Sequence, residues 1–584
     1  MNFLKSFLAS LLGTFIALGL ISILFFTGIA AIATSINFKT VNSAFISENS
    51  VLNIDLNTSV RDRSPAFNPF GFFTENATGI IGMDAIIGSI NMAKKDEKIK
   101  GIRLNSGLIS SGWAQAREIR DCLNEFKKSG KFIYAYADFM SQKGYYVSSV
   151  ADSIFMNPVG SIELKGLSSE VLYFEDFQNQ YGLKMEVIRH GKYKSAVEPF
   201  LQDKMSDENR AQIKGLLDAV WTTISDEIVE SRTISKKALE KMVEELTVTD
   251  AKEAITNGII DALVYEDDFE KSIKAALEID KDDSINSVEF YELNTQMKTF
   301  DSDVKDQIAV IYANGPILYT SGTEEVIGKK ALNQSFQEVE TNKNIKGAVL
   351  RIDSPGGDAM TSEIILNAMR KLKGKKPLVV SLGNIAASGG YYIACLGDKI
   401  YASPMTITGS IGVLAAFPNM RGLAERIGIN AEQVNSHKNA MGYSLFEPLN
   451  DGFKNSTKSA IEKVYTTFKS RVSEGRSLNM EKVEDLSKGR IWSGRDAVEN
   501  GLVDAIGGLE DAIQATAEMA AIENYNIDSY PKYENEFEYI FLDALSFIRL
   551  KIFNHPIEKF ASELFKLLEM EGIQAIIPFS INIE

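Results

Sequence analysis

The amino-acid sequence predicts an α/β fold, built from two related domains in tandem and preceded by a single membrane-spanning helix. Three observations carry this prediction. A long uncharged run stands near the amino terminus, one unit of sequence occurs twice, and short apolar runs alternate with amphipathic stretches within each copy. The length of 584 residues is enough for several domains that each bury a core of their own.

The amino-terminal run extends from residue 7 to residue 35 and contains no charged side chain. A membrane-spanning helix needs about 20 apolar residues, whereas the apolar core of a signal peptide has about 7–15. We therefore expect an uncleaved anchor. Lys5 precedes the run, and the positive-inside tendency then puts the terminus in the cytoplasm. The rest of the chain would lie across the membrane, which in a bacterium is the periplasmic side of the inner membrane.

The repeat is clearest in two pairs of segments, each pair separated by 246 residues. "KIKGIRL" at 98–104 reappears as "NIKGAVL" at 344–350, and "GYYVSSVADSIFMNP" at 144–158 reappears as "GYYIACLGDKIYASP" at 390–404. In the carboxyl-terminal region, residues 557–570 are amphipathic, which favours a helix packed on a core over one that packs on a partner or lies on a membrane surface. The predicted divisions are a cytoplasmic stub, anchor and connector at 1–47, a first domain at 48–293, a linker at 294–307, a second domain at 308–525, and a tail of unknown role at 526–584.

Strands and helices alternate within the second copy. Apolar, β-rich runs at 308–313, 347–353 and 377–382 are bounded by Gly, Pro or Asn and predict strands. Between the last two runs, residues 361–373 carry apolar side chains at helical spacing and basic ones near their end, which predicts a helix. Because strands and helices alternate in this way, we expect parallel sheets and an α/β fold.

Composition argues against several classes of function. The net charge of −16 argues against a protein that wraps nucleic acid, which requires a basic surface. The two cysteines and three histidines have no spacing typical of metal ligands, so we expect neither a metal nor another cofactor. These residues are Cys122, Cys395, His190, His437 and His555.

Ser388, in "AASGG", is a candidate nucleophile. It follows an apolar run and stands at an expected helix start, among small residues that leave room for a substrate. Amide groups of Gly389 and of Gly356 or Gly357, in "SPGG", can converge on an oxyanion. Alternatively, the serine only caps the helix and the glycine pair only forms a tight turn. The first copy has Gln142 in place of Ser388 while the fold-determining residues beside it persist, which favours chemistry over capping.

Lys194 is the candidate base for Ser388. When the "EP" dipeptides of the two copies are aligned, Lys194 in the first copy stands opposite Tyr443 in the second. Each copy therefore lacks one partner, and together they hold one Ser–Lys pair. A lysine acts as a base if burial lowers its pKa, which is ordinarily about 10.4. The alternative is that Lys192 and Lys194 lie on a solvated loop without a catalytic role.

Five motifs resemble the long, tandem-domain form of the signal peptide peptidase A family, namely "SPGG", "AASGGYY", "TGSIGV", "YKSAVEPF" and "WSGRDAVENGLVD". The resemblance covers roughly residues 50–525 in order and implies a serine–lysine protease of the ClpP/crotonase-like fold. It further implies a bowl-like homotetramer that cleaves leftover signal peptides and needs no metal or nucleotide. The roles it implies are nucleophile for Ser388, general base for Lys194, lysine-orienting serine for Ser410, and oxyanion hole for Gly356, Gly357 and Gly389.

Two other functions are compatible with parts of the sequence. A crotonase-like acyl-CoA enzyme uses paired backbone amides to hold a thioester oxyanion, but works in the cytosol and usually with a Glu or Asp acid/base. A membrane-tethered scaffold without activity gives no reason for the complementary loss of Ser and Lys in the two copies. The sequence leaves open the peptide preference and whether the two residues meet within one chain or between neighbours.

Overall fold

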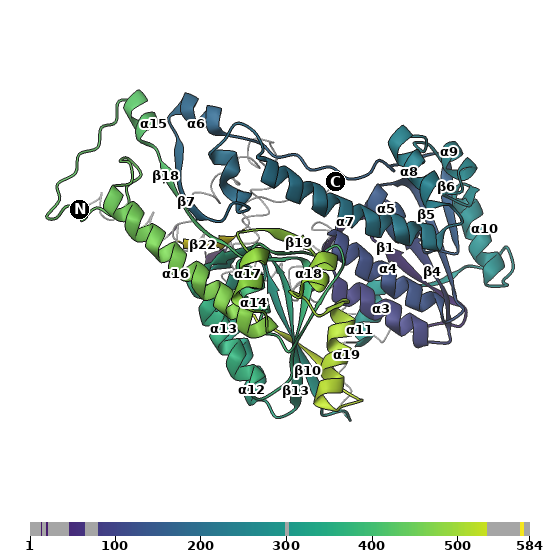
Figure 1. Cartoon of the computed structure of the whole chain (residues 1–584). Coiled ribbons are helices and arrows are strands. Elements are labelled where there is room, and N and C mark those ends of the chain that lie inside the picture. Colours follow the sequence, from purple (N-terminus) through teal and green to yellow (C-terminus); the bar gives the residue numbers. More distant parts are fainter. Residues whose placement is uncertain are drawn as a thin grey trace.

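The computed structural model describes residues 13, 19–20, 46–64, 80–297, 303–533 and 573–576. Figure 1 shows the sheet of the first copy to the right and that of the second copy at the lower centre. Except for residues 13, 19 and 20, the run predicted to span a membrane lies outside the described residues, as does the amphipathic stretch 557–570. Within the described part of the chain, no helix is long and apolar enough to cross a bilayer.

The first copy forms a six-stranded parallel sheet in the order β8-β6-β5-β4-β1-β9. Helix α10 packs on one face of this sheet, and helices α3 and α4 pack on the other. The strands are β1 (Ser50–Asp55), β4 (Ile99–Asn105), β5 (Phe132–Met140), β6 (Ser153–Ile162), β8 (Ala262–Leu263) and β9 (Asn286–Glu289). The helices are α3 (Met83–Lys95), α4 (Trp113–Lys127), α5 (Gln142–Ser148), α6 (Glu175–Tyr181), α7 (Asp207–Ser231), α8 (Lys236–Glu245), α9 (Ala251–Thr256), α10 (Glu266–Ala276) and α11 (Phe290–Met297).

The second copy repeats this plan around the strand order β19-β17-β15-β13-β10-β21, with β16 beside β15 and β20 beside β16. Its strands are β10 (Gln307–Asn314), β13 (Ile345–Ser354), β15 (Leu378–Ala387), β16 (Lys399–Ala402), β17 (Ile407–Gly409), β19 (Ile491–Ser493), β20 (Ala505–Ile506) and β21 (Asn526–Tyr530). Its helices are α12 (Lys329–Thr341), α13 (Ala359–Lys373), α14 (Gly389–Ala394), α15 (Arg421–Arg426), α16 (Asp451–Arg476), α17 (Met480–Leu486), α18 (Gly494–Asn500) and α19 (Leu509–Ala520). The pairings in this sheet are parallel except for β17 with β19.

Alternate residues of the central strands enter opposite cores, as the period of two in a strand requires. In β10, Ile308 and Val310 pack with α19, whereas Ala309 and Ile311 pack with α12 and α13. Because both faces are covered, the strands read as continuous apolar runs. The three strands and the helix predicted in the second copy are confirmed, and so is the α/β fold class.

The repeated aspartates have a structural role. Asp152 accepts a hydrogen bond from the backbone N–H of Ile133 at 2.8 Å, and Asp398 accepts one from Leu378 at 2.8 Å. In each copy the carboxylate therefore fixes the start of a strand. This shared contact explains why these aspartates occur in both copies without implying any chemistry.

Helix and strand bounds differ from two of the divisions drawn from the sequence. Helix α11 begins in the first core, where Leu293 is buried, and continues to Met297, inside the stretch predicted as a linker. Strand β21 pairs with β10 although it lies beyond residue 525, within the predicted tail. The sheet of the second copy thus continues to Tyr530.

A third sheet joins the two halves in the order β12-β11-β14-β22-β18-β7. Strand β7 comes from the first copy and pairs antiparallel with β18 of the second. The members are β7 (Lys184–His190), β11 (Ile317–Leu318), β12 (Ile327–Gly328), β14 (Gly356–Asp358), β18 (Val413–Asn419) and β22 (Ile573–Ile576). The short strands β2 (Ser59–Arg61) and β3 (Ile80–Gly82) form a separate pair, and a 3₁₀ helix, Ser195–Phe200, follows β7.

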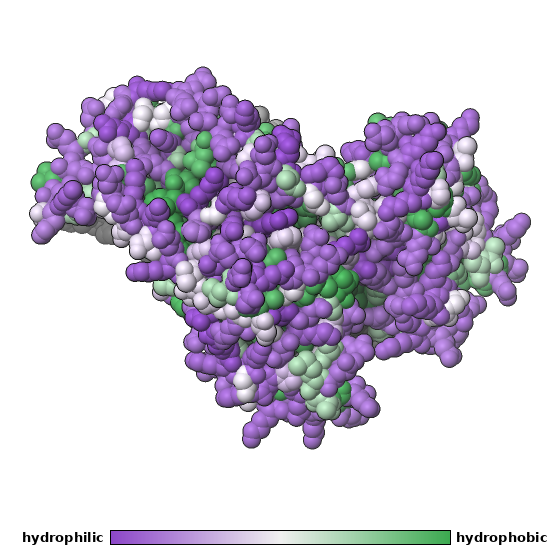
Figure 2. Space-filling model, in the orientation of Figure 1, coloured by the Kyte–Doolittle hydropathy of each residue, from purple (hydrophilic) through white to green (hydrophobic). Residues whose placement is uncertain are grey.

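A buried ion cluster also holds the copies together. The guanidinium of Arg351, in β13, lies 2.8 Å from Asp62 and 2.8 Å from Glu118, both in the first copy. Burial opposes ionisation of Asp62, but Arg351 outweighs this effect and holds its pKa below the usual value. On the face shown in Figure 2, hydrophilic residues cover most of the surface. Arg351, Asp62 and Glu118, by contrast, are charged residues that are buried inside the molecule.

Candidate active site

Ser388 lies at the sharp turn between β15 and α14, the only residue separating the strand from the helix. Its φ of 54° and ψ of −116° are unusual for a residue with a side chain and cost on the order of 1–3 kcal/mol. A hydrogen bond from its N–H to the Gly409 carbonyl (2.8 Å) helps to hold this conformation. The Ser388 side chain makes no capping bond to the helix, so the interpretation as a simple cap is wrong.

Lys194 reaches Ser388 from the first copy. Its Nζ lies 2.7 Å from Ser388 Oγ and donates a hydrogen bond to it. Strand β7, paired with β18, brings the chain to this point, and Arg189 in β7 donates a hydrogen bond to the Lys194 carbonyl at 3.1 Å. The two residues separated by 194 positions in the sequence therefore meet within one chain.

Ser410 supplies the remaining contacts of the amine. Lys194 Nζ donates to Ser410 Oγ at 3.0 Å and lies 3.1 Å from the Ser410 carbonyl oxygen. Ser410 has a φ of 53° and donates its own N–H to the Arg490 carbonyl, so its position is fixed by the backbone. The amine is thus surrounded by three neutral oxygen atoms that belong to Ser388 and Ser410.

Burial changes the protonation of Lys194. The side chains of Ser388, Lys194 and Ser410 are 0%, 1% and 2% exposed. This loss of hydration lowers the pKa of Lys194 from its usual value near 10.5 to about 7. In the described part of the chain, no carboxylate forms an ion pair with Lys194, so nothing offsets the effect of burial.

Two glycines that sequence reasoning did not identify make room for the lysine. A Cβ added to Gly489 would lie 2.6 Å from Lys194 Cβ, and one added to Gly412 would lie 3.2 Å from Lys194 Cδ. Gly489 also has a φ of 84°, which favours glycine. Gly412 stands in the quoted "TGSIGV" motif, so the motif was a signal for it, whereas Gly489 lies outside every motif recognised.

The glycine pair of "SPGG" forms strand β14. Gly356 and Gly357 have φ values of 99° and 155°, and a Cβ added to Gly357 would lie 2.0 Å from the Ile317 carbonyl oxygen. The N–H of Gly356 donates to Ser354 Oγ at 3.2 Å. Gly389 begins helix α14 directly after Ser388. At Gly357 the backbone therefore approaches its neighbour as closely as only glycine permits.

The equivalent position in the first copy holds no nucleophile. Gln142 is buried at the start of α5, where its side chain donates to the Gly166 carbonyl at 2.9 Å. It also accepts from the backbone N–H groups of Lys165 and Gly166. Gln142 therefore holds the loop after β6, and the first copy contributes only a base to the shared pair.

In the part of the chain that the structure describes, the other titratable candidates make no hydrogen bond to the side chains of Ser388 or Lys194. The His190 ring packs on the Tyr465 ring, with 4.2 Å between the ring centroids. The His437 ring shares a hydrogen bond with the Ser436 hydroxyl. Cys122 and Cys395 are free thiols. His555 lies outside the described residues, and among those described no group of three or more His, Cys, Asp or Glu side chains is arranged to hold a metal.

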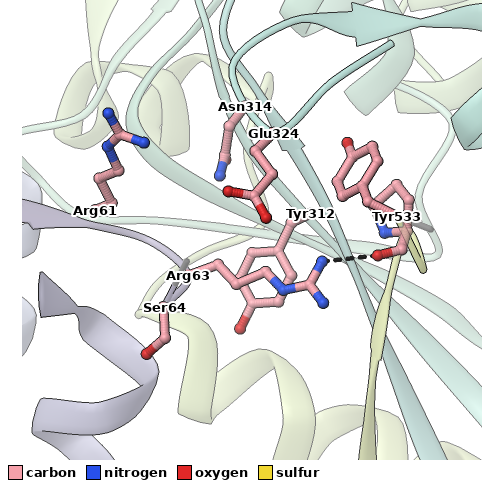
Figure 3. Close-up of a pocket in the computed structure, with 8 residues that line it drawn as sticks. Arg61, Arg63, Ser64, Tyr312, Asn314, Glu324 and Tyr533 are labelled. Atoms are coloured by element: carbon pink, nitrogen blue, oxygen red, sulfur yellow. Dashed lines mark hydrogen bonds between the residues drawn. The ribbon is translucent and has the colours of Figure 1, made fainter. Parts of the chain in front are cut away.

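A small pocket lies away from the pair. It encloses about 30 Å³, enough for about one water molecule. Figure 3 shows Arg63, which follows β2, extending across the ring of Tyr312 in β10, and Arg63 donates to the Pro531 carbonyl at 2.8 Å. Neither Ser388 nor Lys194 lines it. We therefore assign this pocket to packing between segments.

Lys194 is expected to lower stability at neutral pH. In the unfolded chain its pKa returns to about 10.5, so between pH 7 and 10.5 the unfolded state binds more protons and wild-type stability rises with pH. Lys194→Met removes this dependence. We expect it to be more stable than wild type at pH 7, by about 1–4 kcal/mol, with the gain declining towards pH 10. Unfolding measured across this range tests it, and a difference between the two proteins that is constant with pH would contradict a neutral buried amine.

Comparison with known proteins gives the same division into two copies. The model of "Peptidase family S49" matches residues 125–280 and 370–523, which contain Lys194 and Ser388 respectively. "Protease 4" of Haemophilus influenzae is 33% identical over 460 residues, covering 76% of this chain and 75% of that protein. "Serine protease SPPA, chloroplastic" of Arabidopsis thaliana is 32% identical over 440 residues, covering 74% and 64%. "Putative signal peptide peptidase SppA" of Enterococcus faecium is 32% identical over 284 residues, covering 47% and 80%.

Proposed function

The chain belongs to peptidase family S49 and is a serine protease of the long, tandem-domain type, and we propose that it cleaves peptides with a Ser388–Lys194 dyad. The observation that carries this proposal is the 2.7 Å separation of Lys194 Nζ and Ser388 Oγ in a buried site. A neutral amine at this distance can accept the hydroxyl proton directly.

In the first half of the proposed reaction, Lys194 takes the proton of Ser388 as Oγ attacks the carbonyl carbon of a peptide bond. The tetrahedral intermediate carries its negative charge on the former carbonyl oxygen. Lys194, now an ammonium, gives the proton to the leaving amine, and the peptide bond breaks. Ser388 is left as an ester of the acyl portion.

In the second half, Lys194 accepts a proton from a water molecule that attacks the ester, then returns it to Ser388 Oγ as the acid product leaves. Ser410 holds the amine towards Ser388 in both halves through its hydroxyl and carbonyl oxygens. We assign the oxyanion to the amides of Gly389 and the pair Gly356–Gly357. Gly356 would exchange its bond to Ser354 Oγ for one to the oxyanion.

We propose that the substrates are cleaved signal peptides and similar apolar peptides. The name of the Enterococcus faecium relative and the uncharged run at 7–35 support this substrate class, because an anchor would keep the protease beside such peptides. The anchor, the periplasmic position and a homotetramer complete the proposal. Membership in a peptidase family favours this reaction over the acyl-CoA chemistry and the inactive scaffold considered from the sequence.

The pH dependence of cleavage tests the lysine base. Because protonated Lys194 cannot accept the serine proton, kcat/KM is expected to rise about tenfold per pH unit below 7 and to level off above it. A fluorogenic peptide containing the apolar core of a signal peptide is a suitable substrate. A profile that is flat from pH 5.5 to 8.5, with chemistry as the slow step, would exclude a base of this pKa.

A further inference from the structure

Strand β15 carries a bulge shortly before the nucleophile. Its ladder with β13 runs from the pair Ile352–Leu382 directly to the pair Ser354–Ala386. The distance that β13 covers in two steps therefore takes four steps in β15, and residues 383–385 stand opposite a single residue of β13. A bulge bends its strand and changes the direction of the side chains that follow it.

The bulge is also where β15 changes its partner. Before it, residues 379–382 pair with β16, and after it, residues 385–387 pair with β17. Strand β17 ends at Gly409, directly before Ser410, which holds the lysine amine. The four residue pairs between β4 and β5 in the first copy, which has no nucleophile, show no such shift. The bulge thus belongs to the copy that carries the nucleophile, and it leads the strand towards the lysine site.

Asp353, the residue of β13 opposite the bulge, holds it with its side chain. Its Oδ1 accepts a hydrogen bond from the Ile385 N–H at 2.9 Å, and its Oδ2 accepts one from Asn384 Nδ2 at 2.9 Å. Gly383 makes room for this contact, because a Cβ added there would lie 3.1 Å from Asp353 Cβ. The carboxyl therefore supplies the acceptor that the interrupted ladder does not.

The main chain of Asp353 is fixed on the side of the oxyanion glycines. Its carbonyl accepts a hydrogen bond from the Gly315 N–H at 2.9 Å. The next residue is Ser354, whose Oγ accepts from the Gly356 N–H at 3.2 Å. Asp353 is thus joined through its backbone to the segment assigned to the oxyanion, and through its side chain to the strand that ends before Ser388.

The first copy contacts the same bulge through Asn384. The Oδ1 of Asn384 accepts a hydrogen bond at 3.2 Å from the Gln115 N–H, in the first turn of α4. Such first-turn N–H groups have no partner within their own helix. Asn384 therefore caps a helix of the first copy while it donates to Asp353 in the second.

We propose that Asp353 is a positioning residue for the reaction, whose carboxyl sets the direction in which β15 presents Ser388 to the Lys194 amine and the oxyanion glycines. The proposal rests on the proposed function, since it takes Ser388 as the nucleophile. A displacement of about 1 Å at the reacting atoms costs on the order of 10² in rate. The two hydrogen bonds, rather than the charge of Asp353, are expected to prevent such a displacement.

Two substitutions separate positioning from general stability. Asp353→Ala removes both acceptors, and we expect kcat for the fluorogenic peptide to fall about 10²-fold while KM changes by less than about threefold. The matched control is Asp398→Ala. Asp398 accepts from the Leu378 N–H at the other end of the same strand and lies 3.1 Å from the Lys373 amine. We expect this variant to have a lower unfolding midpoint but wild-type kcat. An unchanged kcat in Asp353→Ala, or an equal loss in both variants, would overturn the proposal.

Asp353→Asn tests whether the hydrogen bond or the charge is needed. Loss of hydration and the neighbouring Asp62 carboxylate raise the pKa of Asp353 to about 7, so a neutral side chain is tolerated at this position. Asparagine keeps an oxygen that accepts from the Ile385 N–H. We expect kcat within about threefold of wild type, and a loss as large as that of Asp353→Ala would overturn the proposal.

Asn384→Ala keeps the test decisive if Asp353→Ala does not fold. This variant retains the bond from the Ile385 N–H to Asp353 and loses only the second bond to the carboxyl, together with the contact to α4. We expect kcat to fall about tenfold with little change in KM. A wild-type kcat in this variant would overturn the proposal.

Modification of Ser388 by a fluorophosphonate separates this proposal from the proposed function, because it needs an activated serine but no peptide. We expect Asp353→Ala to be modified at least about tenfold more slowly than wild type, and Asp398→Ala to be modified at the wild-type rate. If wild type is modified at Ser388 but cleaves no peptide, the proposed function fails, whereas these rates still support the positioning role. If wild type cleaves peptides and Asp353→Ala is modified at the wild-type rate, the positioning role fails and the proposed function stands.

Discussion

Replacing Ser388 with alanine is expected to abolish peptide cleavage and leave the fold intact. The substitution removes Oγ, the atom that lies 2.7 Å from the Lys194 amine and that would form the acyl bond. Without a covalent intermediate, only binding and oxyanion contacts remain, so kcat should fall by a factor on the order of 10⁴ or more. Cleavage of the fluorogenic peptide by the purified variant measures this loss.

The matched control for this substitution is Ser335→Ala. Ser335 is also buried in the second copy, but its hydroxyl donates to the Ala331 carbonyl within α12, away from the dyad. We expect this variant to keep wild-type kcat. Cleavage by Ser388→Ala at more than about a tenth of the wild-type rate would show that another group is the nucleophile.

Lys194→Met is expected to inactivate the protein as fully as Ser388→Ala. Methionine is of similar length and fills the channel beside Gly412 and Gly489, but it cannot accept the serine proton. Because the two groups act as a unit, a double variant should lose no more activity than either single one. Single-turnover cleavage by the three variants measures this, and losses that multiply in the double variant would show that the two residues act separately.

Lys192 provides the control for this prediction. Its side chain is 58% exposed and its amine lies 3.9 Å from Glu208, so Lys192→Ala should retain activity. Mixed assembly adds a second check, because Lys194 and Ser388 meet within one chain. Coexpressed Lys194→Met and Ser388→Ala chains should remain inactive. Restored activity would mean that the dyad forms between neighbouring chains.

Much of this arrangement follows from local patterns in the sequence. The strands of the second copy are apolar runs bounded by turn residues, and helix α13 has the expected periodicity. Ser388 and Lys194 could be identified because each occurs in only one copy. Ser410 could be identified only by family resemblance, since a serine in a glycine-rich loop has no distinctive periodicity.

The features that could not be predicted depend on contacts between distant segments. Strand β7 has no residue that is fully buried, so no alternation of apolar side chains indicated that it pairs with β18. Arg351 resembles a solvent-facing charge within an apolar strand, yet it is buried because Asp62 lies opposite it. The φ of 54° at Ser388 results from the turn between strand and helix and has no signature in residue type.

The rate at which a serine-reactive fluorophosphonate modifies Ser388, measured against pH in wild type and in Lys194→Met, tests the central claim most directly. Peptide mapping identifies the modified residue without any assumption about the substrate. The dyad predicts modification of Ser388 in wild type, with a rate that rises through about pH 7, and little or none in Lys194→Met. Equal rates in the two proteins, or modification of a different serine, would contradict it.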